Sequence, residues 1–174
     1  MPRQMATSDD LVMQVVDRMG IGSLSWKSLV MVNLADATVD PDRVWLAWAN
    51  IDKWPSMSPL VISTRWASGE PWRPGSEFVA EMRLGLRFWR GTAENRVIAV
   101  DPGQSAEWGQ SRAGVRRADL WRFEPREGGG AHITSVTVFH GAPIGVMKPF
   151  VAKRWQRLFR AQTEGLVEMA EAVD

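Results

Sequence analysis

The last part of the chain, residues 149–174, has helical periodicity with one apolar face. The apolar side chains recur on a single stripe, which comprises Val151, Trp155, Leu158, Leu166 and Met169. The opposite side of the same helix is basic, with Lys153, Arg157 and Arg160. A long helix with one apolar face has to bury that face against another element. The fold must therefore supply a surface on which this helix can lie.

The preceding part of the chain supplies that surface as a series of short strands. Six segments rich in β-branched and aromatic residues are separated by turn signals, and they are residues 60–67, 76–84, 86–100, 105–111, 115–125 and 132–141. The glycine run in 126–131 is typical of a hairpin loop. Because short strands joined by hairpins pair with their neighbours, the pattern predicts an antiparallel sheet.

A strand and two short helices are expected before this series. Residues 28–39 are too rich in β-branched and apolar side chains for an exposed segment, so they predict a strand. Asp40 can cap a following helix over 41–51, with Pro41 in its first position. Pro55 and Pro59 end that helix or break it into two pieces. The fold class is therefore α+β, a curved antiparallel sheet wrapped around a long C-terminal helix.

Residues 1–27 are expected to form an N-terminal extension to a domain that spans 28–174. Ser8, Asp9 and Asp10 precede an apolar helical segment over 11–19, which ends at Gly20. Three roles are open for this helix. It packs on the domain, it mediates a homodimer, or it stays loose.

Composition excludes several classes of function. The 174 residues are 45% hydrophobic, enough for one domain with a substantial core. The 21 basic and 20 acidic residues give a net charge of +1, so the chain has no overall field that would hold nucleic acid or a membrane surface, and any such binding would need a local patch. Without cysteine there is no disulfide, thiolate metal site or cysteine nucleophile. No signal region or 18-residue apolar run is present, so we expect a cytoplasmic protein without stable membrane insertion.

The sequence also gives no sign of a metal or a cofactor. Its two histidines, His132 and His140, lie on one predicted strand and are roughly 26 Å apart at the rise of a strand, too far to share a metal ion. His132 adjoins the glycine loop and is expected to be exposed. No P-loop, HExxH or dinucleotide-binding glycine pattern occurs, and no serine lies in a nucleophile elbow. We therefore predict a site without metal or cofactor.

The order of these elements resembles the START-like helix-grip superfamily (SRPBCC), particularly its bacterial polyketide cyclase/dehydrase-like branch. The resemblance covers roughly residues 28–172 and rests on "VDPDRVWLAWANIDKWPSMSP", "RVIAVDPGQSAEW", "LWRFEPREGGGAHIT" and the terminal helix. Asp52, Trp54 and Pro55 match the family's acid-x-x-Trp-Pro segment, which turns the first short helix into the second. We expect Asp52 to accept backbone hydrogen bonds in this turn and Trp54 to cap the core. Met57 stands where many members have a second tryptophan.

The resemblance implies a cavity between the sheet and the long helix. Strand alternation places Trp121 and Phe123 on one face with Asp119 and Arg117. The family's pattern turns the aromatic pair inward, so the two charged residues either extend this interior row or lie beyond it in solvent. Alternation elsewhere adds an inward set of Phe78, Ala80, Met82, Trp108, Ile133, Ser135, Thr137 and Phe139.

Two residues of the terminal helix bear on the same cavity. Gln162 lies at the centre of the apolar stripe, where its amide needs partners from the sheet, from buried water or from a ligand. Gly165, one turn along, either widens the space or allows close packing. The predicted ligand contacts are Phe78, Met82, Trp108, Trp121, Phe123, Phe139, Val151, Trp155, Leu158 and Gln162.

The favoured function is the binding of a small hydrophobic molecule, polyketide-like or lipid-like. The resemblance also implies a first alternative, an aromatase/cyclase or dehydratase that orients its ligand and assists with an acid or base. Its candidate catalytic groups are Asp119, Arg117, Arg90 and His140, the last only if a bulge turns it inward. A second alternative is a lipid-transfer or protein-interaction module. In that case Lys148, Lys153, Arg157 and Arg160 contact phosphate groups, or they form an ordinary solvated face.

Overall fold

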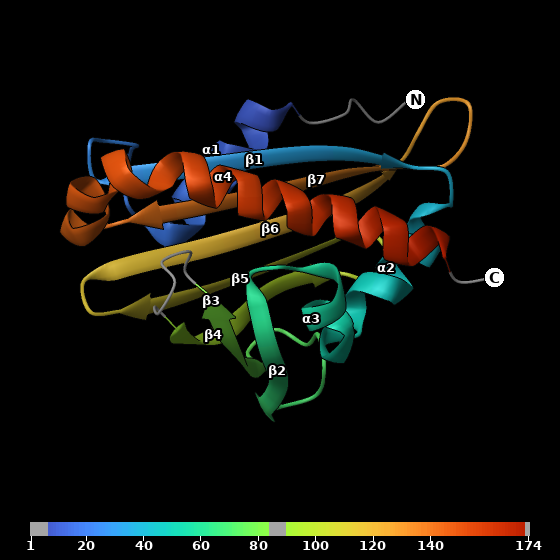
Figure 1. Ribbon diagram of the computed structural model, residues 1–174, viewed down its shortest axis with the longest axis horizontal. Helices are drawn as coiled ribbons and strands as arrows, with labels where there is room; N and C mark the ends of the chain where they lie inside the picture. Colours follow the sequence, from blue (N-terminus) through green and yellow to red (C-terminus); the bar gives the residue numbers. More distant parts are fainter. Residues whose placement is uncertain (1–6, 84–89, 173–174) are drawn as a thin grey trace.

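The computed structural model describes residues 7–83 and 90–172, and it has the expected α+β helix-grip architecture (Figure 1). Seven antiparallel strands form one sheet in the order β1-β7-β6-β5-β4-β3-β2. The strands are β1 (Ser28–Ala37), β2 (Val61–Ser68), β3 (Glu77–Arg83), β4 (Arg90–Asp101), β5 (Ser105–Arg112), β6 (Val115–Pro125) and β7 (Ala131–His140). The hairpin series predicted from the turn signals is therefore confirmed.

The long helix α4 (Ala142–Glu171) lies along β1 on one face of the sheet (Figure 1). It begins before Pro149, where the sequence predicted its start, because Pro143 and not Pro149 occupies the first turn. The buried stripe also differs from the prediction. Phe159 and Ala170 are buried, whereas Leu158 and Met169 are only half-buried.

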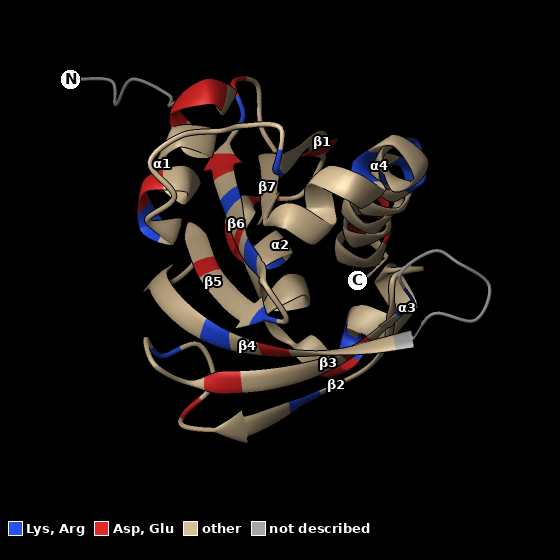
Figure 2. Ribbon diagram, turned by 90° about the vertical axis from the view of Figure 1, so that its left-hand side faces the viewer, with Lys and Arg blue, Asp and Glu red and all other residues tan. Residues whose placement is uncertain are grey.

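Helix α1 (Ser8–Met19) packs on the other face of the sheet, so β6 and β7 lie between α1 and α4 (Figure 2). Thr7 caps α1 in a capping box with Asp10, and the helix therefore begins earlier than the predicted segment over 11–19. A second hydrophobic cluster joins the two elements and consists of Leu11, Val12, Val15, Val16, Ala118, Leu120, Val136 and Val138. Of the three roles considered for this helix, packing on the domain is the one observed.

Three short helical elements, α2 (Pro41–Ala49), η1 (Ile51–Lys53) and α3 (Trp54–Met57), close one end of the concave face. Asp40 caps α2 as predicted, with Oδ1 accepting from the Arg43 backbone N–H at 2.9 Å. Asp52 does not have the role expected of it. It is exposed, and its own N–H donates to the Asn50 side chain at 3.2 Å, so Asn50 stabilises the turn.

Helix α4 passes very close to α3. A methyl group built on Gly165 would lie 2.1 Å from the Met57 carbonyl oxygen, so only glycine fits at this crossing. Of the two roles considered for Gly165, the structure supports close packing and not a widened cavity.

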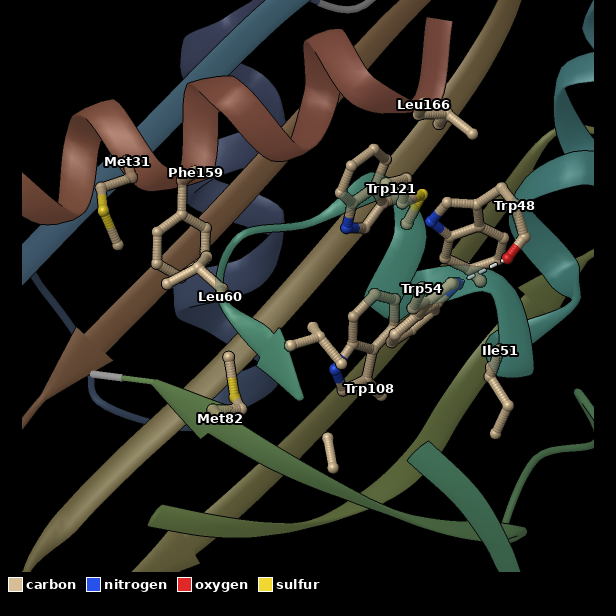
Figure 3. Packing of buried hydrophobic residues seen from close by; sticks show 14 of the residues in the cluster. Met31, Trp48, Ile51, Trp54, Leu60, Met82, Trp108, Trp121, Phe159 and Leu166 are labelled. Atoms are coloured by element: carbon tan, nitrogen blue, oxygen red, sulfur yellow. Dashed lines mark hydrogen bonds between the residues drawn. The ribbon is translucent and has the colours of Figure 1, made fainter. Parts of the chain in front are cut away.

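The main core is an aromatic cluster centred on Trp48 (Figure 3). Trp48 is fully buried, and its ring centroid lies 4.4 to 5.9 Å from those of six neighbours: Trp45, Trp54, Trp72, Trp108, Trp121 and Phe123. Trp54 caps this core as predicted, and its Nε1 donates to the Trp48 carbonyl oxygen at 2.7 Å. Most of the ten tryptophans in the sequence are therefore part of the packed interior.

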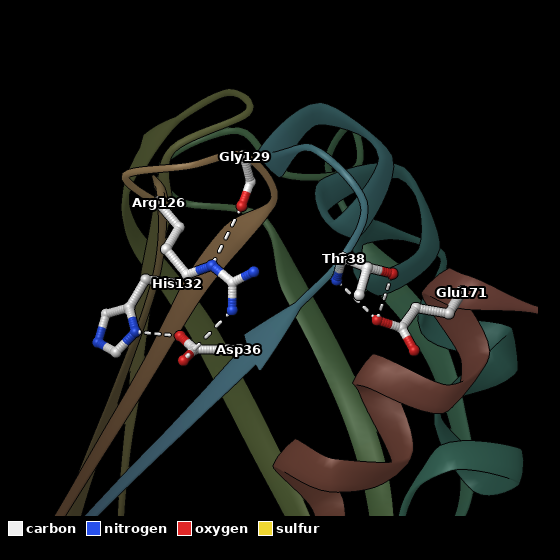
Figure 4. Close-up of polar contacts among 6 residues, drawn as sticks. All are labelled: Asp36, Thr38, Arg126, Gly129, His132 and Glu171. Carbon is white, nitrogen blue, oxygen red and sulfur yellow. Dashed lines mark hydrogen bonds and ion pairs between the residues drawn. The ribbon is translucent and has the colours of Figure 1, made fainter.

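Polar contacts join the end of β1 to β7 and to the end of α4 (Figure 4). His132 Nδ1 lies 2.7 Å from Asp36 Oδ1, and this hydrogen bond lowers the pKa of Asp36. The Thr38 N–H and hydroxyl donate to Glu171 Oε1 at 2.7 and 2.8 Å, and these bonds lower the pKa of Glu171. His132 is half-buried and held in place, and not simply exposed as the sequence indicated.

A buried carboxyl group lies on β5 beneath α1. Glu107 is 2% exposed, and its Oε2 lies 3.4 Å from Gln14 Nε2 and 3.7 Å from Arg18 Nε. Burial raises the pKa of Glu107 above its ordinary value of 4.5, although the positive charge of Arg18 opposes this effect.

Replacing this carboxyl should change how stability depends on pH. With a raised folded-state pKa, the folded chain keeps a proton that the unfolded chain has lost, so Glu107 makes stability fall as pH rises from about 4.5 through that pKa. We expect Glu107→Gln to gain stability relative to the unmodified protein between pH 4.5 and pH 7.5, as measured by urea unfolding. The exposed Glu94→Gln is the matched control. An equal shift in both variants would contradict the assignment to Glu107.

Candidate ligand site

An open cleft of about 640 Å³ lies between the sheet and the first turns of α4. Its walls are largely apolar and include Met82, Ala93, Val115, Phe139, Ile144, Met147 and Trp155, which come from four strands and the helix. The volume falls in the range that holds small organic ligands. Two arginines also line the cleft, and Arg117 is buried whereas Arg112 is exposed, so the cleft combines apolar walls with one buried positive group.

Arg117 is held in place on several sides. Its Nη2 donates to Asp119 Oδ1 at 2.9 Å, and its Nε lies 2.7 Å from Asp119 Oδ2. The guanidinium carbon lies 5.3 Å from the Phe139 ring centroid and 5.5 Å from that of Phe159, within the range of cation–π contact. The remaining contact is weaker, because Nη1 is 3.2 Å from the thioether sulfur of Met82, a poor acceptor.

Asp119 is 1% exposed and lies behind Arg117 on the same face of β6. The Thr137 hydroxyl donates to its Oδ1 at 2.7 Å. Its Oδ2 has the ion-pair contact with Arg117 but no aligned hydrogen bond from any described residue. The carboxylate therefore keeps unused capacity to accept a hydrogen bond.

A second, much smaller cavity of about 20 Å³ lies deeper in the molecule. Trp108 and Trp121 contribute apolar walls, while Asn95 and Gln162 contribute amides. The buried Oδ1 of Asn95 has no hydrogen-bond partner in the described part of the chain. This volume is close to what one water molecule needs. Met82 and Arg117 line both cavities, so this pair of side chains separates the open cleft from the inner cavity.

The sequence matches the family described as polyketide cyclase / dehydrase and lipid transport over residues 33–171. The chain belongs to this family. The match includes every strand of the sheet beyond the start of β1, as well as the whole of α4. The comparison with curated proteins found no match.

Solved structures show the same fold at low sequence identity. The protein TTHA0849 from Thermus thermophilus has a TM-score of 0.70 and 15% identity, over 83% of this chain and 99% of that one. The Zhui aromatase/cyclase from Streptomyces sp. R1128 has a TM-score of 0.68 and 12% identity, over 83% and 94%. The major latex-like protein 151 from Panax ginseng has a TM-score of 0.66 and 12% identity, over 85% and 99%. At such identities the likeness establishes the fold and not the activity.

The structure brings together two of the four polar groups that the family resemblance pointed to. Arg117 and Asp119 are both buried and paired, so they do not lie beyond the sheet in solvent. His140 lies on the opposite face, because β7 pairs with β6 and β1 without a bulge and the His140 Nδ1 lies 2.9 Å from the Ser28 hydroxyl. Arg90 begins β4, but its side chain lies outside the described residues.

The predicted ligand contacts of this family member divide into three groups. Met82, Phe139 and Trp155 line the open cleft, whereas Phe78, Trp108, Trp121 and Gln162 line the inner cavity. Phe123 and Val151 are buried in the core and Leu158 is half-buried against it. The sequence reasoning missed Ile144 and Met147, because it started α4 too late. Pro143 indicates the earlier start, because proline can occupy the first turn of a helix, and this start places Ile144 and Met147 on α4.

No group of three or more histidine, aspartate or glutamate side chains is arranged to hold a metal ion in the described ranges. None of the helices over 7–83 and 90–172 is long and apolar enough to span a membrane.

Proposed function

We propose that the open cleft binds a small hydrophobic molecule, polyketide-like or lipid-like, with a polar group of the ligand against Arg117. The observation that carries this proposal is the combination of a cleft of about 640 Å³, apolar walls and one buried guanidinium at its inner end. Burial of apolar ligand surface supplies affinity in such a site, and a few polar groups fix the orientation.

The contacts that Arg117 makes within the protein favour a neutral oxygen on the ligand over a carboxylate. Asp119 already neutralises its charge, so an anionic ligand would compete with a buried carboxylate nearby. Within the described residues, in contrast, the Nη1 group has the sulfur of Met82 as its one hydrogen-bond partner. A ketone or hydroxyl oxygen is a better acceptor than a thioether and can replace it at this position. The ligand class that fits is therefore apolar with a neutral oxygen function.

Binding can be tested with Prodan, a neutral naphthalene ketone whose fluorescence shifts in apolar surroundings. Met147 lines the cleft and is half-buried on α4, so Met147→Trp should fill part of the volume and weaken binding by about tenfold or more. Met13→Trp makes the same change on the exposed side of α1 and should leave the affinity unchanged. Fluorescence titration of both variants measures the two dissociation constants.

Two results would contradict the proposal. A failure of the unmodified protein to bind Prodan saturably would remove the support for a ligand site. Equal affinities of the Met147→Trp and unmodified proteins, with thermal unfolding unchanged, would place the probe outside the cleft.

A second candidate function is cyclisation or dehydration of a polyketide-like chain. It is favoured by the Asp119 Oδ2 atom, which accepts no hydrogen bond from the described residues and so could take a proton from a ligand. This function ranks second because Asp119 lines the inner cavity and is covered by Arg117 on the side of the open cleft. Time-dependent loss of water from a bound β-hydroxy ketone, abolished in Asp119→Asn, would favour it over simple binding.

A further inference from the structure

Large apolar side chains are exposed at the beginning of α4 and in the segment before β1. Phe150 is 85% exposed, Val146 67% and Trp26 62%. Full burial of such side chains would contribute about 1.5–3 kcal/mol each, so exposing several of them together is unfavourable unless something covers them. These residues are not lining residues of the open cleft, so they are not explained by ligand binding.

The three side chains form one patch. Val146 and Phe150 are one helical turn apart on the outer side of α4, opposite the buried Ile144 and Val151. Trp26 packs against the helix beside them, because a methyl group built on Gly145 would lie 2.2 Å from its ring. We call Trp26, Val146 and Phe150 the apolar tip of α4.

Positive charge surrounds this apolar tip. Residues 142–163 contain no aspartate or glutamate and include five cations, Lys148, Lys153, Arg154, Arg157 and Arg160. All but Lys148 are exposed, and none of those four forms an ion pair with a residue of the described ranges. Figure 2 shows Lys and Arg on the turns of α4. Lys27 adds a further cation, 5.5 Å from the Trp26 ring centroid. The chain as a whole has a net charge of only +1, so positive charge is concentrated here.

We infer that the apolar tip and the basic turns of α4 dock this protein on an anionic lipid bilayer. Aromatic and aliphatic side chains enter the interfacial region of a membrane, while lysine and arginine on the same helix contact lipid phosphates. Charge complementarity identifies the occupant, because exposed cations follow the apolar residues directly along one helix face. The docking is peripheral, since no described helix can span a bilayer.

The position of this surface adds a consequence for the cleft. Pro143, Ile144 and Met147 line the cleft and belong to the same turns of α4 as the apolar tip. Docking through the tip therefore brings the cleft close to the membrane surface. Membrane docking does not depend on the proposed ligand binding, so vesicles alone can test it.

Flotation with lipid vesicles tests the apolar part of this surface. The unmodified protein should partition onto vesicles of phosphatidylcholine with about 30% phosphatidylglycerol, and Phe150→Ala should weaken this partitioning by about tenfold. Leu46→Ala is the matched control, because Leu46 is 72% exposed on α2, away from the proposed surface. It should bind as the unmodified protein does.

The basic part has its own matched pair of variants. Lys153→Gln with Arg157→Gln removes two cations from α4 and should weaken binding by more than tenfold, at about fivefold for each cation. Lys53→Gln with Arg65→Gln removes two exposed cations elsewhere and should have a much smaller effect. Binding should also fall as salt is raised from about 50 to about 300 mM.

Three outcomes would overturn the inference. The first is no flotation with anionic vesicles, and the second is equal flotation with pure phosphatidylcholine. The third is a concentration-dependent dimer, seen by sedimentation without lipid and lost in Phe150→Ala, which would make the apolar tip a contact between two copies of the chain.

Discussion

Arg117→Met should lower the free energy of unfolding by about 3–5 kcal/mol, because it leaves the carboxylate of Asp119 buried without its cation. Asp119 is 1% exposed, and of its hydrogen-bond donors in the described part of the chain the Thr137 hydroxyl would remain. Methionine keeps much of the length of arginine and its contact with apolar neighbours, so the loss should come from the unpaired charge and not from an empty space. Urea unfolding at pH 7 measures it.

A double variant separates the charge from the packing. Arg117→Met with Asp119→Asn removes both charges and keeps an oxygen for the Thr137 hydroxyl, so it should recover most of the lost stability. If the double variant is as unstable as Arg117→Met, the loss comes from packing against Phe139 and Phe159 and not from the buried carboxylate. The same double variant should bind Prodan more weakly, because Nη1 is no longer present.

Strand alternation predicts that Arg117 and Asp119 lie on the same face of the sheet, but it does not predict whether they are buried. Two residues that are two apart on a strand share a face, so their common orientation followed from the sequence once 115–125 was recognised as a strand. The burial of these two residues did not follow from the sequence, because the end of a strand can lie inside or outside a core. It was decided by β7 and α4, which bring Phe139 and Phe159 against the guanidinium from distant parts of the sequence.

The cleft was harder to predict than the fold. The fold follows from hydrophobic periods and turn residues, which are local properties of the sequence. The cleft is the space that side chains leave unfilled, and this depends on all of them at once. Phe78, Trp108 and Trp121 are inward-facing as predicted, but they nearly fill the interior at the end near α2 and α3. The open volume lies at the other end, against the first turns of α4.

The basic residues of the terminal helix predict contact with phosphate groups as one alternative, but the sequence does not indicate the apolar tip. Phe150 and Val146 fall on the opposite side from the main apolar stripe, and each looks like an isolated exposed residue in the sequence. Trp26 is more than a hundred residues away along the chain, and only the contact with Gly145 brings it beside them. A patch assembled from separate segments has no signature in one local window.

Trp48→Ala should have the other large effect, a loss of about 3–5 kcal/mol in the free energy of unfolding. Trp48 is fully buried, and its ring lies against six other aromatic rings from α2, α3, β5, β6 and the segment between β2 and β3. These neighbours are rigid and support one another, so they cannot collapse into the space that the indole leaves. Urea unfolding measures the loss, and near-ultraviolet circular dichroism reports the ordering of the remaining rings.

Trp26→Ala is the matched control for this variant, since it removes the same side chain from a site that is 62% exposed. It should cost well under half as much stability, because little apolar surface is buried there. Comparable losses in both variants would mean that Trp48 is not the centre of the core. A large loss for Trp48→Ala alone would show that the aromatic cluster holds α2 and α3 against the sheet.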